Sequence, residues 1–385
     1  MPQHDLLVVG AGPVGLALAL ALKNSGLDIV LADARSRTAV LGDPRVLALA
    51  YGTRQTLERL GVWDAIPATP IRTIHVSQQG GFGRTLLQAT DYSVPALGYV
   101  ASAGGLAAAL RVAVERAGIP FLDETEVTAL NPCADRTVAS LTGRGAAARG
   151  GSVGARLVAC AEGSLKAGGP DVVEHDYRQH ALIARLGVAH GHGNRAFERF
   201  TPEGPIALLP CEGHFALVHV VAPERASELL ALDDARYVAL VQQRFGDRVR
   251  LTTVAERLRY PLMLRYRRHP VGQRTVWLGN AAQTLHPVAG QGFNLALRDV
   301  WTLAQTLLDH PGDAGAAATL CAYRDGRRLD RFGAIHFTDA LVRIFSNDVA
   351  PVRTARGAAL FALDVIAPLR HFVARRMMFG ARAWP

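Results

Sequence analysis

Three glycines spaced as G-x-G-x-x-G are the strongest chemical signal in the sequence. Gly10, Gly12 and Gly15, with Pro13 among them, follow the apolar run DLLVV and open a run that suits a helix. The first glycine permits a tight turn, the second lets backbone approach a pyrophosphate, and the third allows close packing of the helix. Asp33 ends the next apolar run, where it would accept hydrogen bonds from ribose hydroxyls. The pattern predicts a dinucleotide site, and the structural alternative is a glycine turn without a ligand.

A second glycine-containing loop distinguishes between the dinucleotides. Residues 279–299 follow the apolar run TVWL and lead into a helix, with Gly290 and Gly292 at the helix start. Bare backbone at a helix N-terminus suits the ribityl chain and the electron-rich edge of an isoalloxazine ring, because partial positive charge there stabilises the anionic reduced flavin. The first motif alone fits NAD as well as FAD, and the second favours a flavin.

These motifs resemble those of a known family. The chain is similar to the ubiquinone-biosynthesis branch of the class A flavoprotein monooxygenases, of the 2-polyprenyl-6-methoxyphenol hydroxylase type, which has the fold of p-hydroxybenzoate hydroxylase. The resemblance covers nearly the whole chain. Its segments are the glycine motif with Asp33, GDPRVLALA with Asp43 and Arg45, CAEGSLKAGG, and residues 279–299.

The resemblance implies which residues surround an FAD cofactor. Those expected beside the reacting part of the flavin are Pro287, Gly290, Gln291 and Gly292. Those expected to bind the cofactor are Gly10, Gly12, Pro13, Gly15, Asp33, Arg45, Val127, Asn280, Gly292 and Asn294. His286 adjoins this loop, with either a local hydrogen-bonding role or a proton-transfer role. No metal is expected, since His190 and His192 have no carboxylate or third ligand at a suitable spacing.

The chain departs from the family pattern at three places. Glu162 and Asn280 stand where most relatives have Asp, and Val100 to Ser102 lack the Gln or Glu that many relatives place near the flavin. Asn280 can still donate and accept hydrogen bonds, so FAD retention is expected. Glu162 reaches one methylene further, towards contacts with the nicotinamide or the pyrophosphate.

The resemblance also implies an activity. NADH or NADPH would reduce FAD, dioxygen would add at flavin C4a, and the resulting hydroperoxide would transfer a hydroxyl group to a phenolic ring, here a polyprenylated ubiquinone precursor. The nicotinamide would visit transiently, because the sequence has no second G-x-G-x-x-G. Two alternatives stay open: a flavin hydroxylase of a soluble aromatic compound, and a non-catalytic flavin-binding subunit of a quinone-biosynthesis assembly.

The elements that must position these residues predict an α/β fold. We expect a Rossmann-like FAD-binding domain, an inserted mixed-sheet substrate domain and a helical C-terminal region. The first comprises residues 1–70, 95–167 and 270–310, the second residues 71–94 and 168–269, and the third residues 311–385. Periodicity predicts one helix within 45–66, one over 104–118 and one helical segment around 223–245.

Composition narrows the class of protein. With 385 residues that are 49% hydrophobic, the chain can bury a large core. It has no apolar run of about 18 residues and no signal-peptide pattern, so we expect a cytoplasmic protein. The widely spaced Cys133, Cys160, Cys211 and Cys321 predict buried, reduced thiols. The arginines lack the aromatic interleaving of a nucleic-acid surface.

The basic excess, a formal charge of +9, lies partly near the end of the sequence. Residues 353–382 alternate arginines with large apolar side chains. As helices they suit peripheral contact with the anionic inner face of a membrane, or with a biosynthetic complex. Packing on their own domain with a solvated arginine face fits the same pattern, because periodicity cannot identify the partner of a helix.

Overall fold

The first sheet of the protein is built from parallel strands. The computed structural model describes residues 3–36, 42–43, 45–143, 150–163, 165, 168–345 and 350–380. The sheet has the order β17-β18-β11-β1-β2-β8. Its strands are β1 (Gln3–Val9), β2 (Ile29–Ala32), β8 (Phe121–Leu122), β11 (Gly151–Cys160), β17 (Val271–Gly272) and β18 (Thr275–Trp277). Along this order, every two adjacent strands pair in parallel except β17 and β18, which are antiparallel.

Alternation along β1 builds a core on each face of this sheet. Leu6 and Val8 pack with three helices on one face, α1 (Pro13–Ala21), α3 (Ala103–Arg116) and α6 (Gln291–Asp309). Leu7 and Val9 face the other side, where Ala139 and Val153 belong to the same cluster. Two antiparallel strands cover that side: β10 (Thr137–Gly143) pairs with β11, and β9 (Thr125–Pro132) pairs with β10. Because successive side chains point to opposite faces, the continuous apolar run LLVV gives a strand that is buried on both faces.

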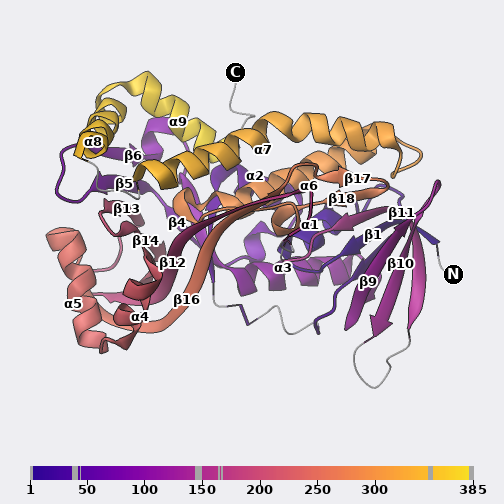
Figure 1. Ribbon diagram of the computed structural model, residues 1–385, viewed down its shortest axis with the longest axis horizontal. Helices are drawn as coiled ribbons and strands as arrows, with labels where there is room; N and C mark the ends of the chain where they lie inside the picture. Colours follow the sequence, from indigo (N-terminus) through magenta and orange to yellow (C-terminus); the bar gives the residue numbers. More distant parts are fainter. Residues whose placement is uncertain are drawn as a thin grey trace.

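The second sheet is mixed and has the order β19-β16-β12-β15-β14-β13-β5-β6. Its strands are β5 (Thr73–Gln78), β6 (Arg84–Gln88), β12 (Val172–Val188), β13 (Arg195–Thr201), β14 (Gly204–Cys211), β15 (His214–Val221), β16 (Leu251–Arg267) and β19 (Gln283–Thr284). Helices α4 (Pro223–Ala231) and α5 (Asp234–Phe245) cover one end of it (Figure 1). The long strands β12 and β16 reach from these helices to the first sheet (Figure 1).

A third, three-stranded sheet joins the two larger ones, with the order β3-β7-β4. Its strands are β3 (Val46–Ala50), β4 (Ala68–Ile71) and β7 (Gly98–Ser102), followed in the chain by α3. The prediction of one helix within residues 45–66 is partly wrong. Helix α2 (Tyr51–Arg59) and the short 3-10 helix Trp63–Ala65 form there, whereas VLALA pairs with β7 as a strand. The helix predicted at 104–118 is confirmed as α3, and the one helical segment predicted around 223–245 is divided into α4 and α5.

Helices form the C-terminal part of the chain, which is α/β overall. α7 (Ala317–Phe345) lies on α6, while α8 (Ala350–Val365) and α9 (Ala367–Phe379) continue along the same side of the molecule (Figure 1). Among the described residues, no helix has by itself the length and hydropathy needed to cross a membrane. Pro351–Val365 and Ala367–Phe379 reach these values only as a pair bent by 96°. Residues 381–385 lie outside the described part.

The four cysteines occupy different environments. All are free, with Cys160 and Cys211 buried as predicted. The prediction of burial is wrong for Cys133, which is exposed at the turn after β9, and Cys321 on α7 is only partly covered. A turn residue has fewer neighbours than a strand or helix residue facing the core, and spacing between cysteines does not carry this information.

Candidate functional site

The glycine motif forms a turn whose three glycines have different reasons to lack a side chain. Gly10 has φ +99°, and a Cβ there would lie 2.8 Å from the Ala161 carbonyl oxygen. A Cβ on Gly15 would overlap the Gly10 carbonyl, so both are required by the protein's own packing. A Cβ on Gly12 would meet only the Arg35 guanidinium, at 3.9 Å. Gly12 therefore leaves a space on the outside of the turn, where a pyrophosphate would lie.

Helix α1 begins at this turn without a side chain to satisfy its first N–H groups. Gly12 is the N-cap, Pro13 occupies the first turn, and no side chain makes a capping hydrogen bond. The free N–H groups and the positive end of the helix dipole suit an anionic ligand. The residues present therefore fit the phosphates of a dinucleotide.

Asp33 lies at the end of β2 beside the turn. Its carboxylate accepts hydrogen bonds from the Ala11 N–H at 2.7 Å and from the Arg35 side chain at 2.9 and 3.1 Å. Burial alone would raise the pKa of Asp33, but the bonds from Arg35 and Ala11 outweigh it and lower the pKa. Arg35 was missed in the sequence, although it stands only two residues after Asp33. It places a positive charge next to Gly12.

Val127 and Arg45 extend this region. The Thr125 N–H donates to the Asp33 carbonyl at 2.8 Å, which brings the start of β9, and Val127 two residues on, to the end of β2. Arg45 donates to Asp43 at 2.6 Å. Both groups lie close enough to Arg35 to shift its pKa, which the charge of Asp43 raises and the charge of Arg45 lowers. Pro44 between them lies outside the described residues.

The second predicted loop places the N-terminus of α6, which also has no side-chain cap, near the N-terminus of α1. Gly279, φ +55°, lies between Val14 of α1 and Ala296 of α6, where a Cβ would be 3.1 and 3.3 Å from their side chains. Gly290, φ +60°, is the N-cap of α6 and would place a Cβ 2.8 Å from the Ala48 Cβ. Gly292 has open space around it. The two glycine motifs, far apart in the sequence, thus form one site.

Asn294 has its hydrogen-bonding capacity filled inside the protein. Its Oδ1 accepts from the Ala50 N–H at 2.8 Å and the Thr53 hydroxyl at 2.7 Å. Its Nδ2 donates to the carbonyls of Ala48 at 2.9 Å and Gly290 at 2.8 Å. We therefore propose that Asn294 holds the loop in place, in contrast to the direct cofactor contact predicted from the sequence.

Asn280 and Pro287 are the remaining predicted residues of this loop. Asn280 is exposed, and its Nδ2 donates to the Gly163 carbonyl at 3.3 Å. It keeps an amide oxygen available to a ligand, as retention of FAD requires. Pro287 is half-buried and precedes the short turn Val288–Gly290. Glu162 is exposed beside Gly163.

An apolar pocket of about 100 Å³ lies against the Gly290 turn. Its wall includes Ile74 and Leu87 from the second sheet, Gln291 from α6 and Met377 from α9. Gln291 is buried, and its Nε2 donates to the Met377 carbonyl at 3.4 Å. The contribution of α9 was missed, because the pattern of residues 353–382 does not show which surface its helices cover.

Glu198 is a second residue that sequence reasoning missed. On β13 it pairs with Val76 of β5, and on the same face its neighbours Ala196 and Phe200 pack towards Val46 and Val288 respectively. Glu198 therefore faces the space between β3 and the flavin loop. Among the described residues, no group hydrogen-bonds or ion-pairs with its carboxyl. Burial raises the pKa of Glu198 to about 7.

His286 is buried next to Pro287 and lies edge-on to Tyr177, with ring centroids 5.3 Å apart. Its Nδ1 accepts from the Val288 N–H at 3.1 Å, while Nε2 has no partner among the described residues. Burial lowers the pKa of His286 to about 4, so the ring is neutral at pH 7. This geometry supports the local hydrogen-bonding role.

His286 should make stability depend on pH. Below pH about 6.5 the unfolded chain binds a proton on this imidazole, whereas the folded chain does so only near its pKa of about 4. The free energy of unfolding therefore decreases as the pH is lowered through this window, by on the order of 2 kcal/mol from pH 7 to pH 5. In His286→Asn the Oδ1 can accept the hydrogen bond that Nδ1 accepts. We expect this variant to lose about 2 kcal/mol less free energy of unfolding than the wild type between pH 7 and pH 5, as measured by urea unfolding. His336→Asn, on the exposed face of α7, is the control. The prediction would be contradicted if the free energy of unfolding changed equally with pH in the wild type and both variants.

A buried charge network supports the second loop from behind. Asp299 of α6 accepts from Gln283 at 2.7 Å and from Arg327 of α7 at 2.8 Å. Arg327 also donates to Asp330 at 2.8 Å, and Arg298 donates to the same carboxylate at 2.7 Å. Desolvation would raise the pKa of Asp330, but the two arginines lower it to about 2. The network joins α6, α7 and the segment leading to the flavin loop.

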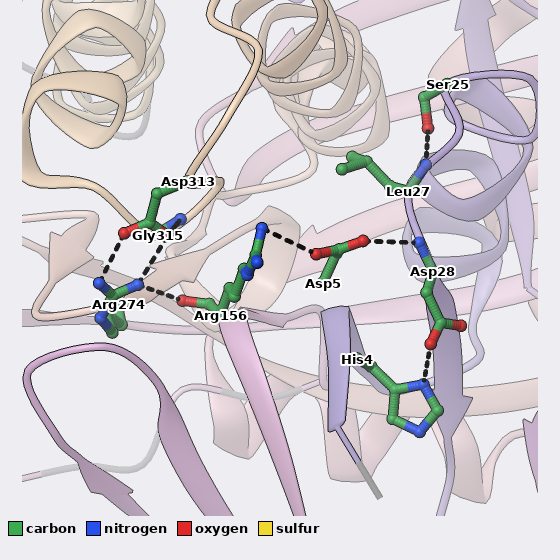
Figure 2. Close-up of polar contacts among 9 residues, drawn as sticks. All are labelled: His4, Asp5, Ser25, Leu27, Asp28, Arg156, Arg274, Asp313 and Gly315. Carbon is green, nitrogen blue, oxygen red and sulfur yellow. Dashed lines mark hydrogen bonds and ion pairs between the residues drawn. The ribbon is translucent and has the colours of Figure 1, made fainter.

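A larger polar hollow of about 500 Å³ lies at the opposite, amino ends of the parallel strands. Its charged groups pair with one another (Figure 2): Asp5 with Arg156 at 3.3 Å, and Arg274 with Asp313 at 2.6 Å. His4 contacts Asp28 at 2.9 Å. These contacts fasten neighbouring strands to the turn before α7. Open α/β sheets bind ligands at their carboxyl ends, so we place the cofactor at Gly12. Within the described residues, no group of three or more His, Cys, Asp or Glu could hold a metal.

The two converging helix N-termini and the acid beside them define a flavin-nucleotide-binding α/β protein. A family model described as "FAD binding domain" matches residues 3–335. The chain belongs to this family of FAD-dependent aromatic monooxygenases.

Three relatives are similar over nearly their whole length. A ubiquinone hydroxylase, UbiL, of Rhodospirillum rubrum is 34% identical, with 99% of this chain and 91% of the relative covered. The 3-demethoxyubiquinol 3-hydroxylase of Escherichia coli is 28% identical, with 94% of each covered. The human mitochondrial ubiquinone biosynthesis monooxygenase COQ6 is 25% identical, with 95% and 91% covered.

A solved structure shows the same fold. The p-nitrophenol 4-monooxygenase PnpA of Pseudomonas putida superimposes with a TM-score of 0.78 at 18% identity, over 99% of this chain and all of the other. The predicted α/β fold class is thereby confirmed, and the family model and the relatives confirm the resemblance to flavoprotein monooxygenases.

Proposed function

We propose that the protein hydroxylates the phenolic ring of a polyprenylated ubiquinone precursor, using dioxygen and NADH or NADPH. When bound, FAD supplies the electron transfer and the activation of dioxygen. The protein binds FAD at the turn of Gly12 and at the start of α6, orients the ring and excludes water. The ubiquinone-pathway relatives support the substrate class. The residues proposed to line the reacting edge of the flavin are Pro287, Gly290, Gln291 and Gly292.

The observation that carries this proposal is the apolar pocket at Gly290. Helix N-terminal backbone forms one side, and the aliphatic side chains of Ile74, Leu87 and Met377 form others. A phenolic ring fits such a wall, since ligand pockets are mostly apolar with a few polar groups that fix orientation. Exclusion of water by these side chains would favour hydroxylation over unproductive release of hydrogen peroxide.

The function is tested by absorption spectroscopy of the purified protein. We expect flavin bands that bleach under anaerobic NADPH or NADH, faster when a short-chain polyprenylphenol is present. In air, the product should be the ring with one more hydroxyl group. Faster reduction with a soluble phenol than with any prenylated one would favour the soluble substrate. FAD retention without phenol-dependent NAD(P)H oxidation would favour a non-catalytic subunit.

We further propose that Glu198 accepts the proton of the ring hydroxyl. Loss of this proton makes the ring carbon more nucleophilic, and the proton moves from the phenol oxygen to a carboxylate oxygen, leaving a phenolate and a neutral Glu198. The position of Glu198 on the sheet face towards Val46 and Val288 supports this role.

This role predicts a pH profile. A base with a pKa of about 7 acts only when ionised, so kcat/KM should rise up to about pH 7 and then level. Glu198→Gln should lower kcat/KM about 100-fold at pH 8, the lower end of the usual contribution of a general base, and should abolish the rise. Glu256→Gln, an exposed carboxyl on β16 of the same sheet, serves as the control. A Glu198→Gln profile that keeps the rise would exclude the role.

A further inference from the structure

Exposed large apolar side chains concentrate on the C-terminal helices. Nine of the thirteen such side chains among the described residues belong to α7, α8, α9 or their junction, and single exposed apolar residues elsewhere are ordinary. We call these nine the apolar face. They are Leu329, Phe332, Phe337, Ile344, Phe361, Val365, Ile366, Leu369 and Phe372.

The buried side of α8 is fixed to the second sheet. The Thr85 hydroxyl donates to the Leu360 carbonyl at 2.8 Å, and Asp364 accepts from the Leu86 N–H at 3.1 Å. Gly357 packs so closely on the 78–82 turn that a Cβ would lie 2.7 Å from the Phe82 carbonyl. The helix is thus held with Phe361 and Val365 exposed, and Ile366 is exposed at the 96° bend between α8 and α9.

The charge around the bend is positive. Residues 350–380 contain five arginines and one acid, Asp364. That acid faces β6, while Arg353 and Arg375 are exposed. Arginines beside exposed aromatic and aliphatic side chains match the boundary between anionic lipid headgroups and acyl chains.

A cavity of about 260 Å³ opens at the apolar face between α7 and α9. Phe337 and Phe372 belong to both the face and the cavity wall. At its inner end, Gln291 and Met377 line this cavity and also the 100 Å³ pocket at Gly290. These two side chains therefore border both spaces, and methionine adapts readily to a new neighbour.

We propose that the apolar face docks on an anionic bilayer and that the cavity behind it receives the apolar tail of the substrate directly from the membrane. The part of this proposal that concerns the substrate tail rests on the proposed function. The ring would occupy the pocket at Gly290, and the tail would pass Met377 and leave between Phe337 and Phe372 without crossing water. A protein partner could cover the same residues, but it would close the mouth of an apolar cavity that leads to the reaction site.

Vesicle binding by the full chain loaded with FAD tests the docking. We expect co-sedimentation with phosphatidylcholine vesicles containing phosphatidylglycerol, weakened by high salt, and little with phosphatidylcholine alone. Phe361→Ser combined with Ile366→Ser should lower the partition coefficient at least tenfold. Val112→Ser, at an exposed apolar position on α3, should leave it unchanged. FAD content shows that each variant folds, and oxidation of NADPH with an untailed phenol should be unaffected by the double variant.

Three results would overturn the docking: no binding to anionic vesicles, equal binding by the double variant, or a wild-type dimer in light scattering that the double variant converts to monomer. The last would assign the face to a second copy of the chain. None of these measurements needs turnover, so they stand apart from failure of the proposed function.

The tail cavity has its own test. Ala334 lines the cavity between α7 and α9 without belonging to the pocket at Gly290. Ala334→Phe should lower kcat/KM for a substrate with a long prenyl tail at least tenfold more than for the same ring without a tail. An equal effect on both substrates would place the tail elsewhere.

Discussion

Replacing Gly12 by aspartate should weaken FAD binding several hundred-fold while the protein still folds. A Cβ at this position meets only the flexible Arg35 side chain, so the substitution is tolerated sterically. The new carboxylate would lie where the pyrophosphate approaches the start of α1. Two like charges 4 Å apart repel by about 4 kcal/mol near a protein surface, which corresponds to several hundred-fold in Kd.

The measurement is titration of the apoprotein with FAD, followed by flavin fluorescence. Gly213→Asp is the matched control, because Gly213 also has open space around it but lies in the turn between β14 and β15. Circular dichroism should show the same helix and strand content in both variants. Wild-type affinity in Gly12→Asp would mean that the cofactor phosphates lie elsewhere.

Replacing Arg327 by methionine should strongly destabilise the protein. The arginine is 4% exposed and pairs with Asp299 and Asp330, which are 1% and 5% exposed. Removing it takes the arginine partner from buried Asp299, while Asp330 keeps Arg298, and breaking a buried ion pair costs about 3–5 kcal/mol. We expect the free energy of unfolding in urea at pH 7 to fall by this amount.

The control for this prediction is on the same helix. Arg324 forms an exposed pair with Asp325, and Arg324→Met should leave the unfolding midpoint unchanged. If Arg327→Met and Arg324→Met unfold alike, the network behind the flavin loop does not stabilise the fold. Because Gln283 bonds to Asp299, Arg327→Met should also weaken FAD binding, in contrast to the control.

The parts of the site predicted from the sequence are those whose signal is local. Gly10, Gly12 and Gly15 stand between a strand and a helix within 15 residues, so backbone geometry and helix dipole follow from adjacent positions. Gly290 at the start of α6 is a similar case. The prediction failed where the partner is distant in the chain: VLALA reads as the beginning of a helix until β7 is known to lie beside it.

Glu198 and α9 show what else the sequence leaves out. The alternation in RAFERFT indicates two faces of a strand without showing which one meets the flavin loop, and only pairing with β5 decides this. In the same way, the apolar residues of α9 fit either its own domain or a membrane. In the structure Ala374 and Met378 are buried, whereas Leu369 and Phe372 are exposed.

The bonds of Asn294 affect how the protein is made on the ribosome. Its amide joins Ala50 to the start of α6 across 244 positions of sequence. The flavin loop can take its final shape only after α6 has left the ribosomal tunnel. At about 5–20 residues per second, synthesis of that length takes tens of seconds. During this time the turn at Gly12 exists without the flavin loop that completes the cofactor site. Cofactor loading is therefore a late event in biogenesis, and nascent chains that end before α6 should emerge without flavin.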